Sequence, residues 1–438
     1  MSENKINANP TKEFFITMLT RDIDLKAAIV ELIDNSIDGA KRTRNGDYKG
    51  LWIKLIFNSE QFTIEDNCGG ISIDIAQHYA FRFGRDPSRP KESGSYTGVF
   101  GIGMKRSLFR LGAYFEVISH CEKEGFELDV DVEKWTQEGG TDWSFQFRKI
   151  WENTLTDIEK CGTRIIVKKL NKGIAENLNL EYFHNQLIHY IEKYRTTAIE
   201  DGLDIYVNEK KIVFVKEQLV DSDNIAPFSK ELVIEDVKAW VLAGIAPKGH
   251  PENAGWYVYC NGRLVLHADQ TTLTGWGVDG IKRHHPSLAA FRGFVFFESD
   301  DSEKLPWNTT KTSVDESSMY YIAAKVLMKE ATQQILKFLS KISSINDEAE
   351  REKVEKTIYD SSLVVLNTAN MKRLRTKENI FNFKMPIPRK EHEKMSIVTY
   401  KKPSSELEKV KKKLKVTSYR EVGEKTYEYY LSRECDFD

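Results

Sequence analysis

The stretch AIVELIDNSIDGAKR, residues 28–42, decides the fold that the sequence predicts. Its apolar residues recur at helical spacing, and Glu31, Asn35 and Asp38 share one stripe because about 3.6 residues complete each turn. A carboxylate can activate a water molecule, and an amide oxygen one turn away can ligate a hard cation. The stretch therefore predicts a helix that carries groups for metal-assisted phosphoryl transfer to water. A polar stripe that simply faces solvent is the alternative for this helix taken alone.

The composition is that of a globular chain. Its 438 residues are 40% hydrophobic and 30% charged, which is enough for two or three domains with buried cores. No apolar run approaches the roughly 20 residues that cross a bilayer, and the first residues lack the layout of a signal peptide. The five cysteines contain no CxxC pair, which argues against a zinc site or a disulfide framework. We therefore expect a cytoplasmic protein with reduced thiols and no membrane contact.

Two further features suit the binding of a flat base. Asp66 ends a predicted strand and is followed by glycines that include Gly70. A carboxylate there can accept a hydrogen bond from an exocyclic amine, and glycines let a ring approach the backbone. Thr163 opens the predicted strand TRIIVKKL, where its hydroxyl could lie beside the same base. Ordinary turn chemistry and an ordinary strand threonine are the alternatives.

A glycine-rich segment suits the binding of phosphate. Gly98, Gly101 and Gly103 precede Lys105 at the start of a predicted helix. Glycines at a helix start expose backbone N–H groups, and the helix dipole adds partial positive charge. The connection before this helix, residues 84–103, has the length and composition of a lid or binding loop. The segment therefore predicts a mobile phosphate-binding lid.

Together and in this order, these features resemble the GHKL superfamily. This is the ATP-binding fold of type II topoisomerases, ninety-kilodalton heat-shock chaperones, sensor histidine kinases and MutL. The resemblance covers roughly the first 200 residues and is nearest to the MutL and MORC branches. It implies an α+β protein whose first domain is the two-layer α/β sandwich called the Bergerat fold, with a mixed, largely antiparallel sheet. Sensor histidine kinases are set aside because no histidine-bearing helix pair precedes the ATP-binding unit.

The resemblance also implies roles for the helix and the lid. Glu31 would be the general base that polarises the attacking water, and Asn35 would hold the Mg²⁺ that bridges the phosphates. Asp38 belongs to the same predicted cofactor-binding stripe. The groups expected to wrap the triphosphate are Gly98, Gly101, Gly103 and Lys105.

For the base, the resemblance implies that Asp66 recognises the adenine amine, with Gly70 beside it, and that Thr163 helps to seat the ring. The sequence departs from the family pattern at one point. Cys68 replaces the first glycine of the D-x-G-x-G motif. Its backbone must then avoid positive φ or be strained, so the course of this loop is left open.

The rest of the chain is expected to form two more regions. We predict a nucleotide-binding domain over residues 1–200, a transducer-like α/β domain over 201–343 that opens with the hairpin 204–215, and a helical, basic C-terminal region over 344–438. In the loop LPWNTTKTSVD, Lys311 falls between a strand and a helix. MutL- and MORC-type ATPases return such a lysine to the γ-phosphate, so the resemblance makes Lys311 catalytic. An ordinary surface lysine is the alternative.

The sequence therefore predicts a Mg²⁺-dependent ATPase that acts as an ATP-gated dimeric clamp. Relatives of this kind serve DNA maintenance and prokaryotic defence. The alternative is an ATP-sensing adaptor that scarcely hydrolyses ATP and regulates a partner protein. The apolar arm before the helix, residues 1–20, would cross to the second subunit. Residues 401–420 hold eight basic and two acidic side chains, a net charge of +6, so nucleic acid or another polyanion is a further expected partner, against the alternative of a solvated helix.

Overall fold

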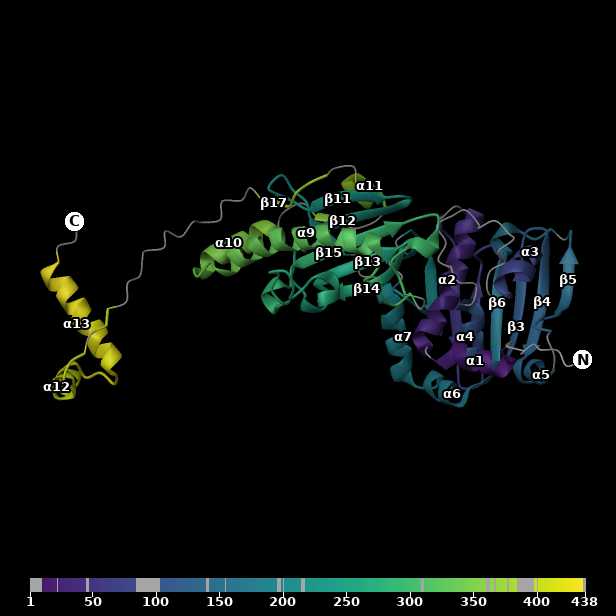
Figure 1. Ribbon diagram of the computed structural model, residues 1–438, viewed down its shortest axis with the longest axis horizontal. Coiled ribbons are helices and arrows are strands. Elements are labelled where there is room, and N and C mark those ends of the chain that lie inside the picture. The colour runs from purple at the N-terminus through teal and green to yellow at the C-terminus, as the bar shows by residue number, and fades with distance from the viewer. Residues whose placement is uncertain are drawn as a thin grey trace, which may run out of the picture. The chain divides into compact units, whose positions relative to one another are not determined.

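The computed structural model (Figure 1) describes residues 10–435 apart from 22, 45–46, 84–102, 139–141, 154, 195–197, 200, 214–216, 309–310, 360–362, 366–367, 376–377, 384–397 and 400. The chain forms two compact units, Met1–Ile387 and Pro388–Asp438, which are described separately.

An eight-stranded sheet forms one layer of the N-terminal part of the first unit. Its strands are β1 (Trp52–Phe57), β2 (Phe62–Asp66), β3 (Gly112–His120), β4 (Glu124–Asp131), β5 (Phe147–Glu152), β6 (Gly162–Leu170), β7 (Asp204–Val207) and β8 (Lys210–Lys211). They lie in the order β5-β4-β3-β6-β2-β1-β7-β8. Among the described pairs of this sheet, β1 and β7 alone run parallel. The prediction of a mixed, largely antiparallel sheet is confirmed.

The hairpin β7–β8 lies at the edge of this first sheet. The sequence placed it at the start of the second domain, but β7 pairs with β1 over Trp52–Leu55. Ile205 and Val207 are buried in the same core as the first sheet, and this apolar face explains the pairing. The predicted hairpin is therefore present, but its expected position is corrected.

The helix predicted from the stretch 28–42 is α2 (Leu25–Arg44). Asp24 caps it, because Oδ1 accepts hydrogen bonds from the N–H groups of Lys26 (2.9 Å) and Ala27 (3.4 Å). Almost every residue from Ala27 to Ala40 is buried, polar ones included. Helix α2 therefore has protein against more than one of its faces. The other helices of this layer are α1 (Lys12–Arg21), α3 (Ile73–Ile75), α4 (Gly103–Leu111), α5 (Val132–Gln137), α6 (Lys172–Leu178) and α7 (Glu181–Tyr194).

A second sheet follows along the chain. Its strands are β11 (Phe228–Ile234), β12 (Val237–Ile245), β13 (Gly255–Cys260), β14 (Arg263–Asp269) and β15 (Phe291–Glu298), in the order β11-β12-β15-β13-β14. Helix α9 (Met319–Ser343) packs along one face (Figure 1) and shares its core. A separate cluster around Trp240 and Tyr257 covers the other face. Because both faces are covered, strands such as β13 are continuous apolar runs, each residue of which is buried.

Shorter elements complete the first unit. They are β9 (Gln218–Val220), β10 (Ile225–Ala226), α10 (Glu348–Tyr359), β16 (Leu363–Val365), α11 (Thr368–Arg375) and β17 (Asn382–Phe383). The second unit contains α12 (Ser404–Leu414) and α13 (Tyr419–Glu434), and Val422 is the buried residue of these two helices. Among the residues described, no helix combines the length and the apolar character needed to cross a membrane. The predicted fold class, α+β with a sandwich followed by further α/β structure, is confirmed.

Candidate functional site

A small cavity lies between α2 and the ends of β2 and β6. Its volume is about 30 Å³, space for roughly two water molecules. The lining contains Asn35, Asp66, Gly70 and Thr163 of the predicted site, together with Leu32, Ser36, Gly39, Arg42, Ile64, Cys68, Ile71, Met104 and Ile165.

Asp66 accepts hydrogen bonds at both of its carboxylate oxygens. Its Oδ1 accepts hydrogen bonds from the N–H groups of Cys68 (2.8 Å) and Thr163 (3.3 Å), and its Oδ2 accepts one from Ser36 Oγ (2.6 Å). Burial raises the pKa of Asp66, while these three bonds act in the opposite direction. A carboxylate offers about four acceptor positions. One position on Oδ2 is therefore left for a donor in the cavity.

The hydroxyl of Thr163 is held by a neighbouring strand. Thr163 Oγ1 lies 3.2 Å from Ser119 Oγ, and Ser119 Oγ accepts a hydrogen bond from the N–H of Ile71 at 2.7 Å. Ser119 is fully buried. These contacts connect the strand β6, the strand β3 and the loop after β2, so the wall of the cavity is fixed from three directions.

The loop after Asp66 accommodates the cysteine that departs from the family pattern. Positive φ falls on Gly69 (97°) and Gly70 (76°), whereas Cys68 is not among the residues with positive φ. A Cβ atom on Gly70 would lie 2.2 Å from the carbonyl oxygen of His120. Glycine is therefore required at Gly70 on two grounds, and Cys68 occupies its position without strain.

A second polar face of α2 carries a buried cluster of charges. Lys311 Nζ donates to Glu31 Oε1 at 3.0 Å, and Arg263 Nη1 lies 3.3 Å from Glu31 Oε2. The same Arg263 nitrogen forms an ion pair with Asp34. Lys311 and Arg263 are only 3% and 5% exposed, and both belong to the chain after residue 201. Two acids and two bases thus form a neutral buried cluster between helix α2 and the second sheet.

The cluster fixes the protonation of Glu31. Burial alone favours the neutral acid, but the charges of Lys311 and Arg263 outweigh it and lower the pKa of Glu31 to about 2. For Lys311, burial lowers the pKa, and Glu31 opposes that effect. In this arrangement Glu31 is ionised and engaged by two cations.

Asp38 lies with this second face and does not line the cavity. It is 3.9 Å from Lys41 Nζ, and Lys41 also donates to the carbonyl of Asn261 at 3.2 Å. Helical rotation explains the difference, because Asp38 falls on the Asp34 side of Glu31 and Asn35 on the cavity side. The three residues expected on a single stripe therefore divide between two faces of α2. Asn35 faces the cavity, and Glu31 and Asp38 lie with the charge cluster. A cofactor contact of Asp38 stays a prediction.

Asn35 fits the predicted metal role. Its side chain lines the cavity, and among the residues described its Nδ2 has no hydrogen-bond partner. The amide nitrogen is therefore not committed to another described residue, and a cation would be ligated by the amide oxygen. Mg²⁺ in phosphate-transfer sites often takes one or two protein ligands and completes its shell with phosphates and water. Asn35 would hold the ion, and the ion would neutralise charge on the phosphates.

The predicted phosphate-binding residues are only partly described. Gly98 and Gly101 lie outside the described residues, and Gly103 begins α4. A Cβ atom on Gly103 would lie 2.0 Å from Glu31 Oε1, so this glycine lets α4 begin directly against the proposed base. Lys105 Nζ instead donates to the carbonyls of Ala80 (2.8 Å) and Arg82 (2.6 Å), and burial lowers its pKa to about 7. Phosphate contact by Lys105 would require the release of both bonds.

Sequence reasoning missed four residues of these networks. Ser36 and Ser119 complete the hydrogen bonds around Asp66 and Thr163, and Asp34 and Arg263 complete the charge cluster. Ser36 had a signal, since a hydroxyl follows Asn35 on the cavity side of the predicted helix. Arg263 belongs to the turn Asn261-Gly262-Arg263, which resembles that of MutL and MORC proteins, but no local signal directed it to α2. Asp34 and Ser119 had no signal that could be read locally.

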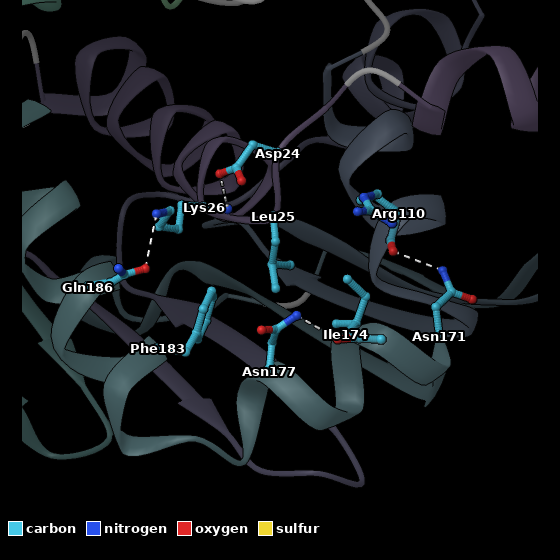
Figure 2. A pocket seen from close by; sticks show the side chains of 10 residues that line it. Asp24, Leu25, Lys26, Arg110, Asn171, Ile174, Asn177, Phe183 and Gln186 are labelled. Carbon is cyan, nitrogen blue, oxygen red and sulfur yellow. Dashed lines mark hydrogen bonds between the residues drawn. The ribbon is translucent and has the colours of Figure 1, made fainter.

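A larger cavity of about 300 Å³ lies at the start of α2 (Figure 2). Lys26 Nζ there donates to Gln186 Oε1 at 3.4 Å, and Asn171 donates to the carbonyl of Arg110 at 2.9 Å. None of the predicted site residues lines it. The chemistry predicted from the sequence gathers instead at Asp66 and Glu31.

The fold and the site define a class of protein: an α/β sandwich with a pocket between a buried polar helix and the sheet. Residues 23–163 match the family model described as histidine kinase-, DNA gyrase B-, and HSP90-like ATPase. This segment is therefore a GHKL-type ATP-binding domain, as the order of the motifs predicted. No curated protein matches the chain.

Proposed function

We propose that the chain is a Mg²⁺-dependent ATPase of the MutL- and MORC-like branch, with Glu31 as the general base. The observation that carries the proposal is the 3.0 Å contact of Lys311 with Glu31. This contact places the ammonium group of Lys311, from the loop after the second sheet, against helix α2, which also lines the proposed nucleotide pocket. Lys311 also adopts φ 53°, a backbone conformation uncommon for lysine.

The residues would divide the chemistry in the following way. Asp66 and Thr163 bind the base, and Asn35 binds the metal that accompanies the phosphates. Lys311 leaves Glu31 for the γ-phosphate, whose charge it neutralises. Glu31 then loses one of the cations that depress its pKa, and so it becomes a stronger base for the attacking water. ATP would thus remove the restraint on its own hydrolysis.

The base pocket supports a quantitative expectation. Asp66→Asn keeps the volume of the side chain but replaces a charged acceptor with a mixed donor and acceptor. ATP affinity should fall by about 1.5–3 kcal/mol, as for loss of a charge-assisted hydrogen bond. Isothermal titration with ATP and with GTP would measure it. Glu65→Gln, on the neighbouring strand position, is the matched control. Equal ATP affinities of Asp66→Asn and wild type would contradict the assignment of the base pocket.

We also propose that nucleotide closes two subunits into a clamp. Helix α1 packs on its own chain, since Lys12 Nζ donates to the carbonyl of Trp135 at 2.7 Å and the Phe15 ring lies 5.2 Å from that of Phe83. The exposed side of α1 carries Phe14 (58% exposed) and Met18 (52% exposed) beside the polar Glu13, Thr17 and Arg21. This exposed side supports a contact with a second copy.

A non-hydrolysable ATP analogue with Mg²⁺ should therefore convert monomer to dimer in analytical ultracentrifugation. Phe14→Ser with Met18→Ser should prevent dimerisation and leave analogue binding unchanged, because both side chains point away from the chain's own core. Lys26→Ser, at the start of α2, where the lysine is half-buried, is the control. A monomer at saturating analogue and tens of micromolar protein would refute the clamp.

An ATP-sensing adaptor remains the second candidate, and one observation favours it. With Glu31 held by two cations, hydrolysis would be slow whenever Lys311 stays in place. Nucleic acid as a client stays a prediction that rests on α12, whose basic side chains include Lys409, Lys412 and Lys413 on one face. A role in DNA maintenance or prokaryotic defence rests on the family resemblance alone.

A further inference from the structure

Arg263 reaches the catalytic helix from a tight turn. Asn261 (φ 48°) and Gly262 (φ 81°) form the two-residue connection between β13 and β14, the geometry that Asn-Gly favours in hairpins. The turn meets α2 at two levels. The carbonyl of Asn261 accepts a hydrogen bond from Lys41, and Arg263 Nη1 contacts Glu31 and Asp34.

This turn is anchored in its own domain. Asn261 Nδ2 donates to the carbonyl of Ser299 (3.0 Å) and to Ser302 Oγ (3.1 Å), and Asn261 Oδ1 accepts a bond from the N–H of Ser299 (3.1 Å). Asn261 is 4% exposed. Arg263 therefore starts from a backbone position that the second sheet holds firmly.

The two cations on Glu31 differ in their freedom to leave. Arg263 begins strand β14 and binds two carboxylates with a planar guanidinium. Lys311 lies in a loop, and its ammonium contacts Glu31 at 3.0 Å and the ring of Trp307 at 5.9 Å. A flexible lysine with one carboxylate partner exchanges that partner more readily than an arginine that is shared between two.

When Lys311 moves to the γ-phosphate, the Glu31 carboxylate loses one neighbouring positive charge and depends on Arg263. Glu31 would remain a buried carboxylate, and an uncompensated buried carboxylate takes up a proton. A protonated Glu31 cannot accept a proton from water. We propose that Arg263 is a positioning residue for hydrolysis, which keeps the Glu31 carboxylate ionised and oriented, with Asp34 as its second anchor, while Lys311 binds the γ-phosphate. This inference rests on the proposed ATPase function.

The decisive comparison is Arg263→Lys against Arg292→Lys. Arg292 is also a buried arginine of the second sheet, and it pairs with Glu217 at 3.0 Å, away from α2. Arg263→Lys should lower kcat on the order of 10²-fold, because it displaces the carboxylate that orients the water. Its KM for ATP should change less than about threefold, since ground-state binding is untouched. Arg292→Lys should leave both parameters near wild type.

Asp34→Asn provides a second, milder test. It should lower kcat less than Arg263→Lys does, and the double variant should resemble Arg263→Lys, because both changes act through one contact. Thermal unfolding and binding of a fluorescent ATP analogue would establish that each variant is folded and loaded. Arg263→Met, which keeps bulk but no charge, should lower kcat at least as far as Arg263→Lys.

The results distinguish failure of the positioning role of Arg263 from failure of the proposed ATPase activity. If the wild type hydrolyses ATP and Arg263→Lys does so equally well, the positioning role is overturned and the ATPase proposal stands. Parallel losses of kcat and ATP affinity in both arginine variants would assign Arg263 a purely structural role and also overturn it. If the wild type releases no phosphate, the ATPase proposal fails, and the positioning role fails with it.

Discussion

Replacement of Glu31 by alanine is expected to lower ATP turnover by roughly 10²–10⁴-fold, the usual contribution of a positioned general base. Nucleotide binding should persist, because Glu31 does not line the base cavity and its loss removes a negative charge near the phosphates. Steady-state phosphate release and equilibrium binding of labelled ATP would measure the two effects separately.

Two further variants sharpen this test. Glu31→Gln keeps the bulk of the side chain and should be as inactive as Glu31→Ala, which would assign the loss to the base. Glu330→Gln, an exposed glutamate that pairs with Lys230, should retain activity. Turnover at the wild-type rate by Glu31→Ala would contradict the assignment of the base. Very slow turnover by the wild type itself would favour the adaptor.

Lys311→Ala is expected to lower kcat by roughly 10²–10³-fold, the cost of removing one charged group that stabilises the transferring phosphoryl. Base recognition should survive, because Asp66 and Thr163 are unchanged, so the affinity for ADP should stay near that of the wild type. Lys304→Ala is the control, since Lys304 precedes the same loop but is exposed and pairs with Asp236.

Acid stability gives Lys311 a second readout that needs no nucleotide. Burial alone would raise the pKa of Glu31, but the charges of Lys311 and Arg263 outweigh burial and lower the pKa to about 2 in the folded chain. The stability that this shift contributes is present above the ordinary pKa of glutamate and is lost as the pH falls toward 2. Lys311→Ala should therefore unfold at a higher pH than the wild type during acid titration. Unchanged turnover and unchanged acid unfolding would together remove Lys311 from the site.

Local pattern was enough to predict the elements that carry the site. The apolar period around Glu31 predicted α2, and the local residues before Asp66 predicted the strand that ends there, because both signals lie within a few residues. The cavity residues followed from the order of the motifs. Asp66, Thr163 and Gly70 do line one cavity.

Contacts between distant parts of the chain could not be predicted in this way. Asp34 and Arg263 meet across more than two hundred residues, and neither carries a local mark of its partner. The parallel pairing of β7 with β1 likewise depends on a distant contact, because Ile205 and Val207 are buried in the core of the first sheet. Asp38 differs for a finer reason. Helix α2 has one polar face at the cavity and another at the charge cluster. The spacing of residues along the sequence does not show where the first face ends and the second begins.

Helix α2 has one face that lines the cavity beside Asp66 and another face that contacts Lys311 and Arg263. Thermodynamic linkage then requires reciprocity between the two faces. If bound ATP changes the equilibrium for docking of the second sheet on α2 by some factor, docking must change the affinity for ATP by that same factor. A partner that grips the second sheet would therefore tune nucleotide affinity from a distance, without touching the cavity.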